Sequence, residues 1–206
     1  MGWLLFAPVF LDLLWGVFIV TGIEQARIVP GITEAMPLDL QYTGVSHSFV
    51  MSIVWGLLVG AGYLALHRGA FRIAVVLFLG VVSHFVLDWI SHGPDMPLVP
   101  HGPRFGLGLW NYPVTALSVE LVLFAVGMSL YLRSTSPRGR GSVIALAVLS
   151  AFLVAVNVGA YFGPPPPGVE AMAATNLLLL VVLWIGARID RSRDALPRFD
   201  PQPVRS

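Results

Sequence analysis

The chain has 206 residues, of which 56% are hydrophobic and 11% are charged. Soluble domains are typically about 25% charged, so this composition excludes an ordinary soluble domain, and the low charge excludes a disordered tail protein. A formal net charge of +1 excludes a strongly basic nucleic-acid-binding protein, and we expect no nucleic acid partner. Because the chain has no Cys, disulfides, zinc–thiolate sites and cysteine nucleophiles are excluded, and any metal must be held by His and carboxylates.

Six predominantly apolar stretches reach the length of about 20 residues that a membrane-spanning helix needs. They cover residues 3–22, 46–66, 71–90, 113–132, 142–162 and 171–186. The first lacks a basic segment before it and contains Asp12, so we interpret it as a retained helix and not as a cleaved signal. The sequence therefore predicts an all-α polytopic protein of the lipid bilayer, with one transmembrane domain over 1–187 and an Arg-rich cytoplasmic tail over 188–206.

The arginines predict the orientation of these spans. With six spans, both termini share one side of the membrane with the loops after the second and fourth spans. That side holds ten of the twelve arginines, namely Arg68, Arg72, Arg133, Arg138, Arg140, Arg188, Arg191, Arg193, Arg198 and Arg205. The opposite side holds only Arg27 and Arg104. Cytoplasmic loops carry the excess of basic residues, so we expect both termini in the cytoplasm and a multi-pass protein of the plasma (inner) membrane.

Three polar residues at the end of the third span suggest a metal site. His84, Asp88 and His92 follow one another at intervals of four, which places them on one face of a helix. An isolated carboxylate costs several kcal/mol in lipid, so we expect this face to point into the bundle. Imidazole and carboxylate suit a divalent Zn, Mn or Fe ion. The alternative is that His84 and Asp88 hydrogen-bond each other and join helices.

His47 opens the second span within Ser46-His47-Ser48, at the depth where the third span ends. It can therefore meet Asp88 or His92, and we take His47, His84, Asp88 and His92 as candidate metal ligands. Ser46 or Ser48 is expected to act as the helix N-cap. On its own, His47 also fits an interfacial histidine.

Four further acidic residues are candidates for the site. Asp12, near the middle of the first span, and Asp95, in a loop that two prolines hold extended, are the candidate catalytic residues, as a general base or as a group that orients a ligand His. Glu24 lies about 18 Å of helix beyond Asp12, so we expect it at the outer rim or against substrate. Glu120 in the fourth span should have a partner, either a ligand His or a structural group.

The residues resemble a family of membrane-bound metal-dependent hydrolases that are described as LexA-binding and inner-membrane-associated. That family pairs a Thr/Ser-His-Ser motif opening one helix with a His-x-x-x-Asp motif ending the next, followed by a Pro-rich loop. Here the matching segments are Ser46-His47-Ser48, His84 to Asp88, and Pro94 to Pro103. The chain departs from the family upstream, where it reads Asp12-Leu13-Leu14-Trp15 in place of a pattern with a second Asp and a His.

The resemblance and the polar residues together predict a metal-dependent membrane hydrolase whose site opens to the outer face. Its position favours a lipid-like, phosphoester or cell-envelope substrate. The alternative is a transporter or permease in which Asp12, His84, Asp88 and Glu120 relay protons or metal ions. A third interpretation, a non-catalytic scaffold, predicts that no metal is bound.

The predicted orientation can be tested by labelling single cysteines, since the natural chain has none. A membrane-impermeant thiol reagent applied from outside the inner membrane should label Glu34→Cys and Gly102→Cys and leave Ser136→Cys unlabelled until the membrane is permeabilised. The reverse pattern would overturn the orientation.

Overall fold

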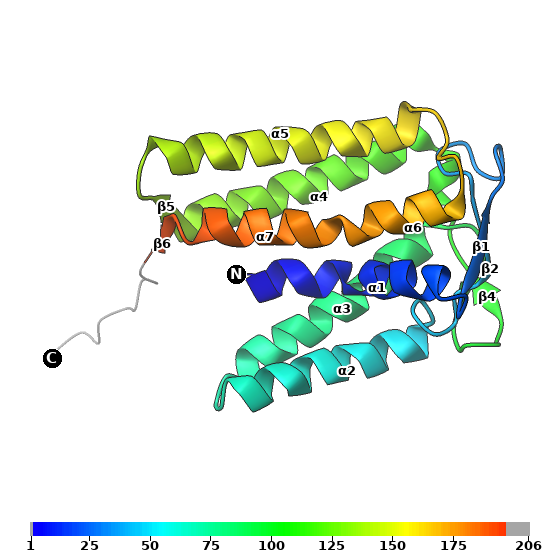
Figure 1. Ribbon diagram of the computed structural model, residues 1–206, viewed down its shortest axis with the longest axis horizontal. Coiled ribbons are helices and arrows are strands. Elements are labelled where there is room, and N and C mark those ends of the chain that lie inside the picture. The colour runs from blue at the N-terminus through cyan, green and yellow to red at the C-terminus, as the bar shows by residue number, and fades with distance from the viewer. Residues whose placement is uncertain (1, 197–206) are drawn as a thin grey trace, which may run out of the picture.

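The computed structural model describes residues 2–196, which form a bundle of membrane-crossing helices with short strands at its two ends (Figure 1). The helices are α1 (Gly2–Val20), α2 (Phe49–Leu66), α3 (Phe71–Ser91), α4 (Pro113–Ser134), α5 (Arg140–Phe162), α6 (Val169–Leu177) and α7 (Leu179–Asp190). Since α6 and α7 follow one another along a single span, the described residues contain six segments long and apolar enough to cross a membrane. The prediction of an all-α fold with six spans is confirmed.

Three small antiparallel sheets connect the helices, and the sequence analysis predicted none of them. They pair β1 (Gln25–Ile28) with β2 (Leu38–Tyr42), β3 (Met96–Pro97) with β4 (Arg104–Phe105), and β5 (Thr135–Pro137) with β6 (Arg193–Ala195). A short 3-10 helix, η1 (Leu109–Asn111), precedes α4. Strands of two to five residues carry too little alternation to stand out from a loop. We call the end of the bundle that carries β1 and β2 the hairpin end (Figure 1).

The helices form two groups joined by the last span. In Figure 1, α1, α2 and α3 lie together, α4 and α5 form a separate pair, and α6–α7 run between α1 and that pair. The N-terminus and β6 lie at the end of the bundle opposite the hairpin end. This placement agrees with six crossings, which bring both ends of the described chain to the same side.

Several boundaries differ from the expected ones. Helix α2 begins at Phe49 and not at residue 46, because Ser48 is the N-cap and its Oγ accepts the Met51 N–H at 3.4 Å. The sixth span runs from Val169 to Asp190, four residues beyond the predicted 171–186, and is interrupted by a turn at Leu178.

The segment predicted as a tail from 188 onward begins in regular structure. Residues 188–190 belong to α7, and β6 then pairs with β5. The Arg193 guanidinium is buried and donates from Nε to Thr135 Oγ1 at 2.9 Å, while Arg138 pairs with Asp194 at 2.8 Å. The β5–β6 sheet therefore ties the α4–α5 connection to the end of α7. The predicted tail arginines Arg198 and Arg205 lie outside the described residues.

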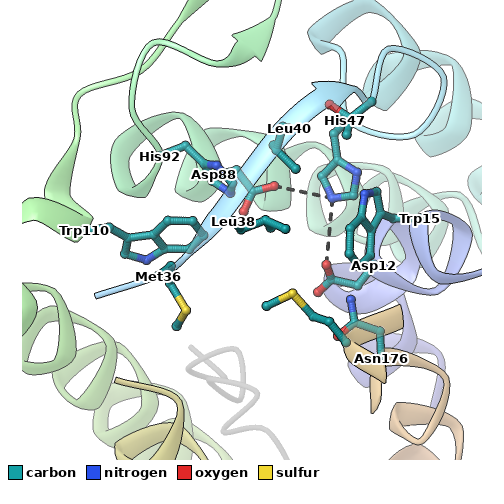
Figure 2. A pocket seen from close by; sticks show the side chains of 12 residues that line it. Asp12, Trp15, Met36, Leu38, Leu40, His47, Asp88, His92, Trp110 and Asn176 are labelled. Carbon is teal, nitrogen blue, oxygen red and sulfur yellow. Dashed lines mark ion pairs between the residues drawn. The ribbon is translucent and has the colours of Figure 1, made fainter. Parts of the chain in front are cut away.

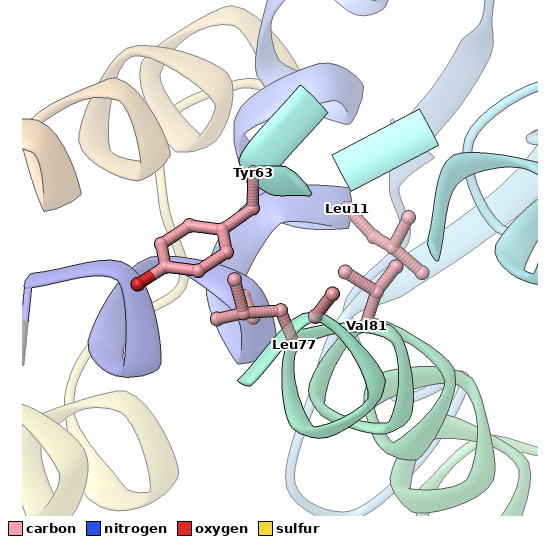
Figure 3. Close-up of a cluster of buried hydrophobic side chains, with 6 residues drawn as sticks. Leu11, Tyr63, Leu77 and Val81 are labelled. Carbon is pink, nitrogen blue, oxygen red and sulfur yellow. The ribbon is translucent and has the colours of Figure 1, made fainter. Parts of the chain in front are cut away.

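The main apolar core lies where α1, α2 and α3 meet (Figure 3). Its buried members are Ala7, Leu11, Tyr63, Ala74, Leu77 and Val81. Leu11, Leu77 and Val81 are completely inaccessible to solvent. Dispersion contacts of this kind drive helix association in a bilayer, where lipid tails remove the hydrophobic advantage of burial.

Small residues let these three helices approach closely. A Cβ added at Gly80 of α3 would lie 3.0 Å from the Ala7 Cβ of α1, and one added at Gly60 of α2 would lie 3.2 Å from the Ala74 carbonyl oxygen of α3. Contacts this short favour glycine, because even a Cβ would force the neighbouring helix to move by a few tenths of an ångström and a larger side chain would push it farther. Gly80 therefore sets the distance between α1 and α3.

Replacing Gly80 by leucine should separate α1 from α3 and destabilise the bundle. Overpacking typically costs about 1–3 kcal/mol, and thermal unfolding in detergent should report it as a lower Tm. Gly62→Leu is the matched control, because a Cβ at Gly62 meets nothing within 4 Å and the gain in helix propensity is the same at both sites. Equal Tm values for the two variants would contradict the assigned role of Gly80.

Candidate metal centre

Two histidines and two aspartates from α1, α3 and the turn that precedes α2 converge inside the bundle, and Figure 2 shows Asp12, His47 and Asp88 of this group. The His84 Nε2 lies 3.1 Å from Asp88 Oδ2 and 3.7 Å from Asp12 Oδ1. The His47 Nε2 lies 3.6 Å from Asp88 Oδ2 and 3.8 Å from Asp12 Oδ1. We call these four residues the His/Asp cluster. Their side chains are between 8% and 33% exposed, so the cluster is largely withdrawn from solvent.

The spacing of these atoms matches what a small cation needs. Ligand atoms around a tetrahedral ion with bonds of about 2.0–2.1 Å lie about 3.3–3.4 Å apart. The four His–Asp distances, from 3.1 to 3.8 Å, lie on either side of that value, and Asp12, His47 and His84 each offer a ligand atom within 4.8 Å of the other two. In addition, His84 Nε2 and Asp88 Oδ2 are buried and have no hydrogen-bond partner among the described residues. Buried polar atoms are normally paired, so these residues fit a bound cation.

A backbone carbonyl of α1 fixes the orientation of His84. The His84 Nδ1 lies 2.6 Å from the Pro8 carbonyl oxygen, which can only accept, so Nδ1 carries the proton. The lone pair then resides on Nε2, which faces Asp12 and Asp88. Hydrogen bonds of this kind orient metal-binding histidines and set their tautomer.

A buried glutamate, acting through a serine, fixes the orientation and tautomer of the His47 ring. Glu24 is only 2% exposed, and its Oε1 accepts the N–H groups of Val45 and Ser46 at 2.8 and 2.7 Å. The Ser46 hydroxyl donates to Glu24 Oε2 at 2.5 Å and lies 2.6 Å from His47 Nδ1. Since a carboxylate oxygen accepts the hydroxyl hydrogen, Ser46 Oγ accepts a hydrogen bond from the Nδ1–H group of His47. The lone pair on His47 Nε2 is then free to bind an ion.

His92 forms a second pair with Asp95 beside the cluster. The His92 Nδ1 lies 3.3 Å from Asp95 Oδ1, and the imidazole packs on the Trp110 ring with centroids 4.0 Å apart. The segment that leads to η1 holds this turn, because Leu107 N–H donates to the Trp89 carbonyl oxygen and Gly108 N–H to that of His92. A Cβ at Gly106 would clash with the Gly93 carbonyl, so glycine is required there.

A pocket of about 270 Å³ lies over the cluster, and we call it the cluster pocket. Its polar walls are Asp12, His47, Asp88 and His92, and Figure 2 shows the Asn176 amide nitrogen pointing toward Asp12. Trp15, Met36, Leu38, Leu40, Thr43, Trp110 and Met172 complete the lining.

Glu120 lies apart from the cluster and joins two helices. Its Oε1 accepts the Tyr161 hydroxyl at 2.5 Å, and its Oε2 accepts the Asn157 amide at 2.8 Å. Both partners lie on α5. Of the two expectations for Glu120, this geometry supports the structural one.

The structure brings together three of the four residues named as candidate ligands, His47, His84 and Asp88. It adds Asp12, which was expected to be catalytic, at ligand distance. His92 instead faces Asp95, and Asp95 does not line the cluster pocket.

The sequence analysis missed several contributors to the site. The roles of Ser46 and the Pro8 carbonyl depend on contacts between distant segments that no local motif marks. Trp110 also lines the pocket, and no motif of the sequence analysis includes it. Asn176 was visible as a polar residue within an apolar span, and that signal could have placed it in the site.

Fold and site together define a polytopic membrane protein with a His/Asp centre inside its helix bundle. The model of the YdjM inner membrane protein family matches residues 37–162, more than half of the 206 residues, so the chain belongs to this family. It is a multi-pass protein of the inner membrane. The matched region includes His47, His84 and Asp88 but not Asp12. No curated protein and no solved structure matches the chain.

If the His/Asp cluster binds a metal ion, Glu24→Gln should weaken that binding without changing a ligand atom. The amide places a donor where the Ser46 hydroxyl needs an acceptor, so the His47 ring loses its fixed tautomer. Changes in such supporting groups typically cost about 10–100-fold in metal affinity, which a competition titration with a zinc chelator would measure. Glu34→Gln, at an exposed loop position, is the control and should bind like wild type. An unchanged affinity in Glu24→Gln would contradict the assigned role of the serine link.

Proposed function

We propose that this protein is a metal-dependent hydrolase with its active site at the hairpin end of the bundle. The observation that carries the proposal is the convergence of two imidazole Nε2 atoms and two carboxylate oxygens at 3.1–3.8 Å. Two carboxylates within a membrane-spanning bundle are costly unless they are compensated. A divalent cation compensates both charges at once.

The residues that would hold the ion are Asp12, His47, His84 and Asp88, a donor set suited to Zn, Mn or Fe. An ion held there would act as a Lewis acid and would lower the pKa of a coordinated water to about 7. The Pro8 carbonyl and the Ser46–Glu24 link keep both imidazoles in the tautomer that presents Nε2.

His92 is the residue that we assign to proton transfer. Asp95 orients its ring through Nδ1, and His92 lines the cluster pocket beside Asp88. In the hydrolysis of an ester, the water oxygen bonds to the phosphorus or acyl carbon and the bond to the leaving oxygen breaks. His92 accepts one water proton and delivers it to the leaving oxygen, so the products are an alcohol and an acid. Asp95 acts through His92 and serves as its positioning residue.

The surroundings of the cluster favour hydrolysis over a relay through the membrane. Below the cluster, toward the opposite end, α1 and α3 are sealed by Leu11, Leu77 and Val81, all fully inaccessible. A proton or ion path would need polar groups there. The arginine distribution supports an outer location of the hairpin end, because eight of the ten arginines within the described residues belong to the opposite side.

Metal content separates this proposal from the scaffold and relay interpretations. Purified wild-type protein should contain about one Zn, Mn or Fe per chain by elemental mass spectrometry, and His84→Ala and Asp12→Asn should lose most of it. His101→Ala is the matched control, because His101 is exposed and stacks on Tyr42 away from the cluster. His92→Ala should retain the metal and lose about 10²–10⁴-fold in hydrolysis of an ester panel. Equal metal content in wild type, His84→Ala and Asp12→Asn would refute the proposal.

A further inference from the structure

A second cavity shares a wall with the cluster pocket. It has a volume of about 590 Å³, and we call it the apolar groove. It runs between the loop 30–37, the C-terminal part of α5 with the following proline loop, and α6. Met36, Met172 and Asn176 line both cavities. The two hollows are therefore adjacent, and the groove extends the site sideways toward α5.

The groove faces the bilayer. No residue in the most apolar stretch of α5 is buried inside the protein. Val156, which lines the groove, is 50% exposed. Most of the lining is apolar and includes Ala160, Pro164 and Leu179. The polar part of the lining consists of Thr33, Glu34, Thr175 and Asn176. A groove that is mostly apolar and is bounded by a lipid-facing helix can admit a hydrocarbon chain.

The cluster pocket is covered on its aqueous side. Strand β2 crosses it with Leu38 and Leu40, and Leu40 is only 4% exposed. Arg104 holds this strand in place, because its guanidinium donates to the carbonyl oxygens of Leu40 (2.7 Å) and Gln41. Asp12 nevertheless remains 33% exposed halfway along α1, about 12 Å of helix from its end. The free space beside the carboxylate is thus intramembrane.

The cluster pocket also offers an unused hydrogen-bond donor. Trp15 is 4% exposed, lines the pocket, and its Nε1–H has no partner among the described residues. A buried indole N–H normally finds an acceptor. An ester or phosphate oxygen of a bound head group would supply one. The polar and apolar halves of the combined cavity thus match the two halves of an amphiphile.

We infer that the substrate is a membrane lipid, whose hydrocarbon chain lies in the apolar groove while its ester-linked head group reaches the His/Asp cluster sideways from the bilayer. This inference rests on the proposed hydrolase function and adds its substrate class. The bond that is cleaved is the ester bond at the junction of head group and chain. Water cleaves it by the hydrolysis described under the proposed function. The small size of the cluster pocket alone, about 270 Å³, agrees with a site that receives only a head group.

Photocrosslinking tests the inference without requiring catalysis. The full-length protein is placed in nanodiscs of phosphatidylcholine doped with phosphatidic acid that carries a diazirine either at the chain end or on the head group. The chain probe should label residues 30–37 and 156–166 several-fold above the lipid-facing surfaces of α2 and α4, and the head probe should label α1 and β2. Uniform labelling of all lipid-facing helices would overturn the inference, because it indicates bulk lipid only.

A blocking substitution provides the matched comparison. Ala160→Trp fills the groove, whereas Ala155→Trp lies on the same helix at an exposed position that lines no cavity given above. Groove labelling should fall at least fivefold in Ala160→Trp and stay unchanged in Ala155→Trp, with metal content unaffected in both. Equal labelling in the two variants would overturn the inference.

A chain-length comparison separates this inference from the proposed hydrolysis. Ala160→Trp should lower kcat/KM for p-nitrophenyl palmitate about tenfold and that for p-nitrophenyl butyrate much less, whereas Ala155→Trp should leave kcat/KM for both esters unchanged. Groove labelling in a wild-type protein that holds no metal and hydrolyses neither ester would refute the hydrolase and support the lipid site. Metal binding and butyrate hydrolysis without groove labelling would refute the lipid site alone.

Discussion

The hydrogen bond from His84 Nδ1 to the Pro8 carbonyl oxygen joins the packing of the bundle to the chemistry of its site. At 2.6 Å it requires α1 to lie directly against α3, and Gly80 makes that distance attainable because a Cβ there would lie 3.0 Å from Ala7. The same bond selects the tautomer that turns Nε2 toward Asp12 and Asp88. Helix packing and ligand orientation are therefore one constraint, and a change that separates α1 from α3 removes both.

Polar and apolar interiors are divided between the two ends of the bundle. The hairpin end holds the His/Asp cluster, the Glu24–Ser46 link and the His92–Asp95 pair. The first three helices are closed below the cluster by an inaccessible core around Leu77. Bilayer hydrocarbon offers no hydrogen bonds. Gathering the polar groups at one end, where they bond one another, therefore allows a charged site inside the membrane, within the half of the bundle nearer the hairpin end.

The sequence predicted what depends on local pattern and length. Six apolar stretches of about 20 residues indicate six spans whatever their packing, and the interval of four between His84 and Asp88 places them together on one helix face. The short distance between Asp12 and His84 could not be predicted, because it depends on how α1 is rotated against α3. The contact that fixes this rotation joins Pro8 to His84, which are 76 residues apart in the chain. Glu24 was placed at the rim because only its distance along α1 was considered. The chain turns back after Gly22, whose φ of +74° suits glycine, and this turn carries Glu24 beneath the Val45–Ser46 backbone.

The β5–β6 sheet closes the last span and α5 into a loop that is tied at both ends. It fastens the α4–α5 connection to the end of α7 through backbone pairing, the buried Arg193 and the Arg138–Asp194 pair. At the hairpin end, the short segment of residues 163–168 joins α5 directly to α6. The turn at Leu178 divides the span between these two attachments. The wall that carries Met172 and Asn176, which the two cavities share, therefore has fixed supports on either side of it along the chain.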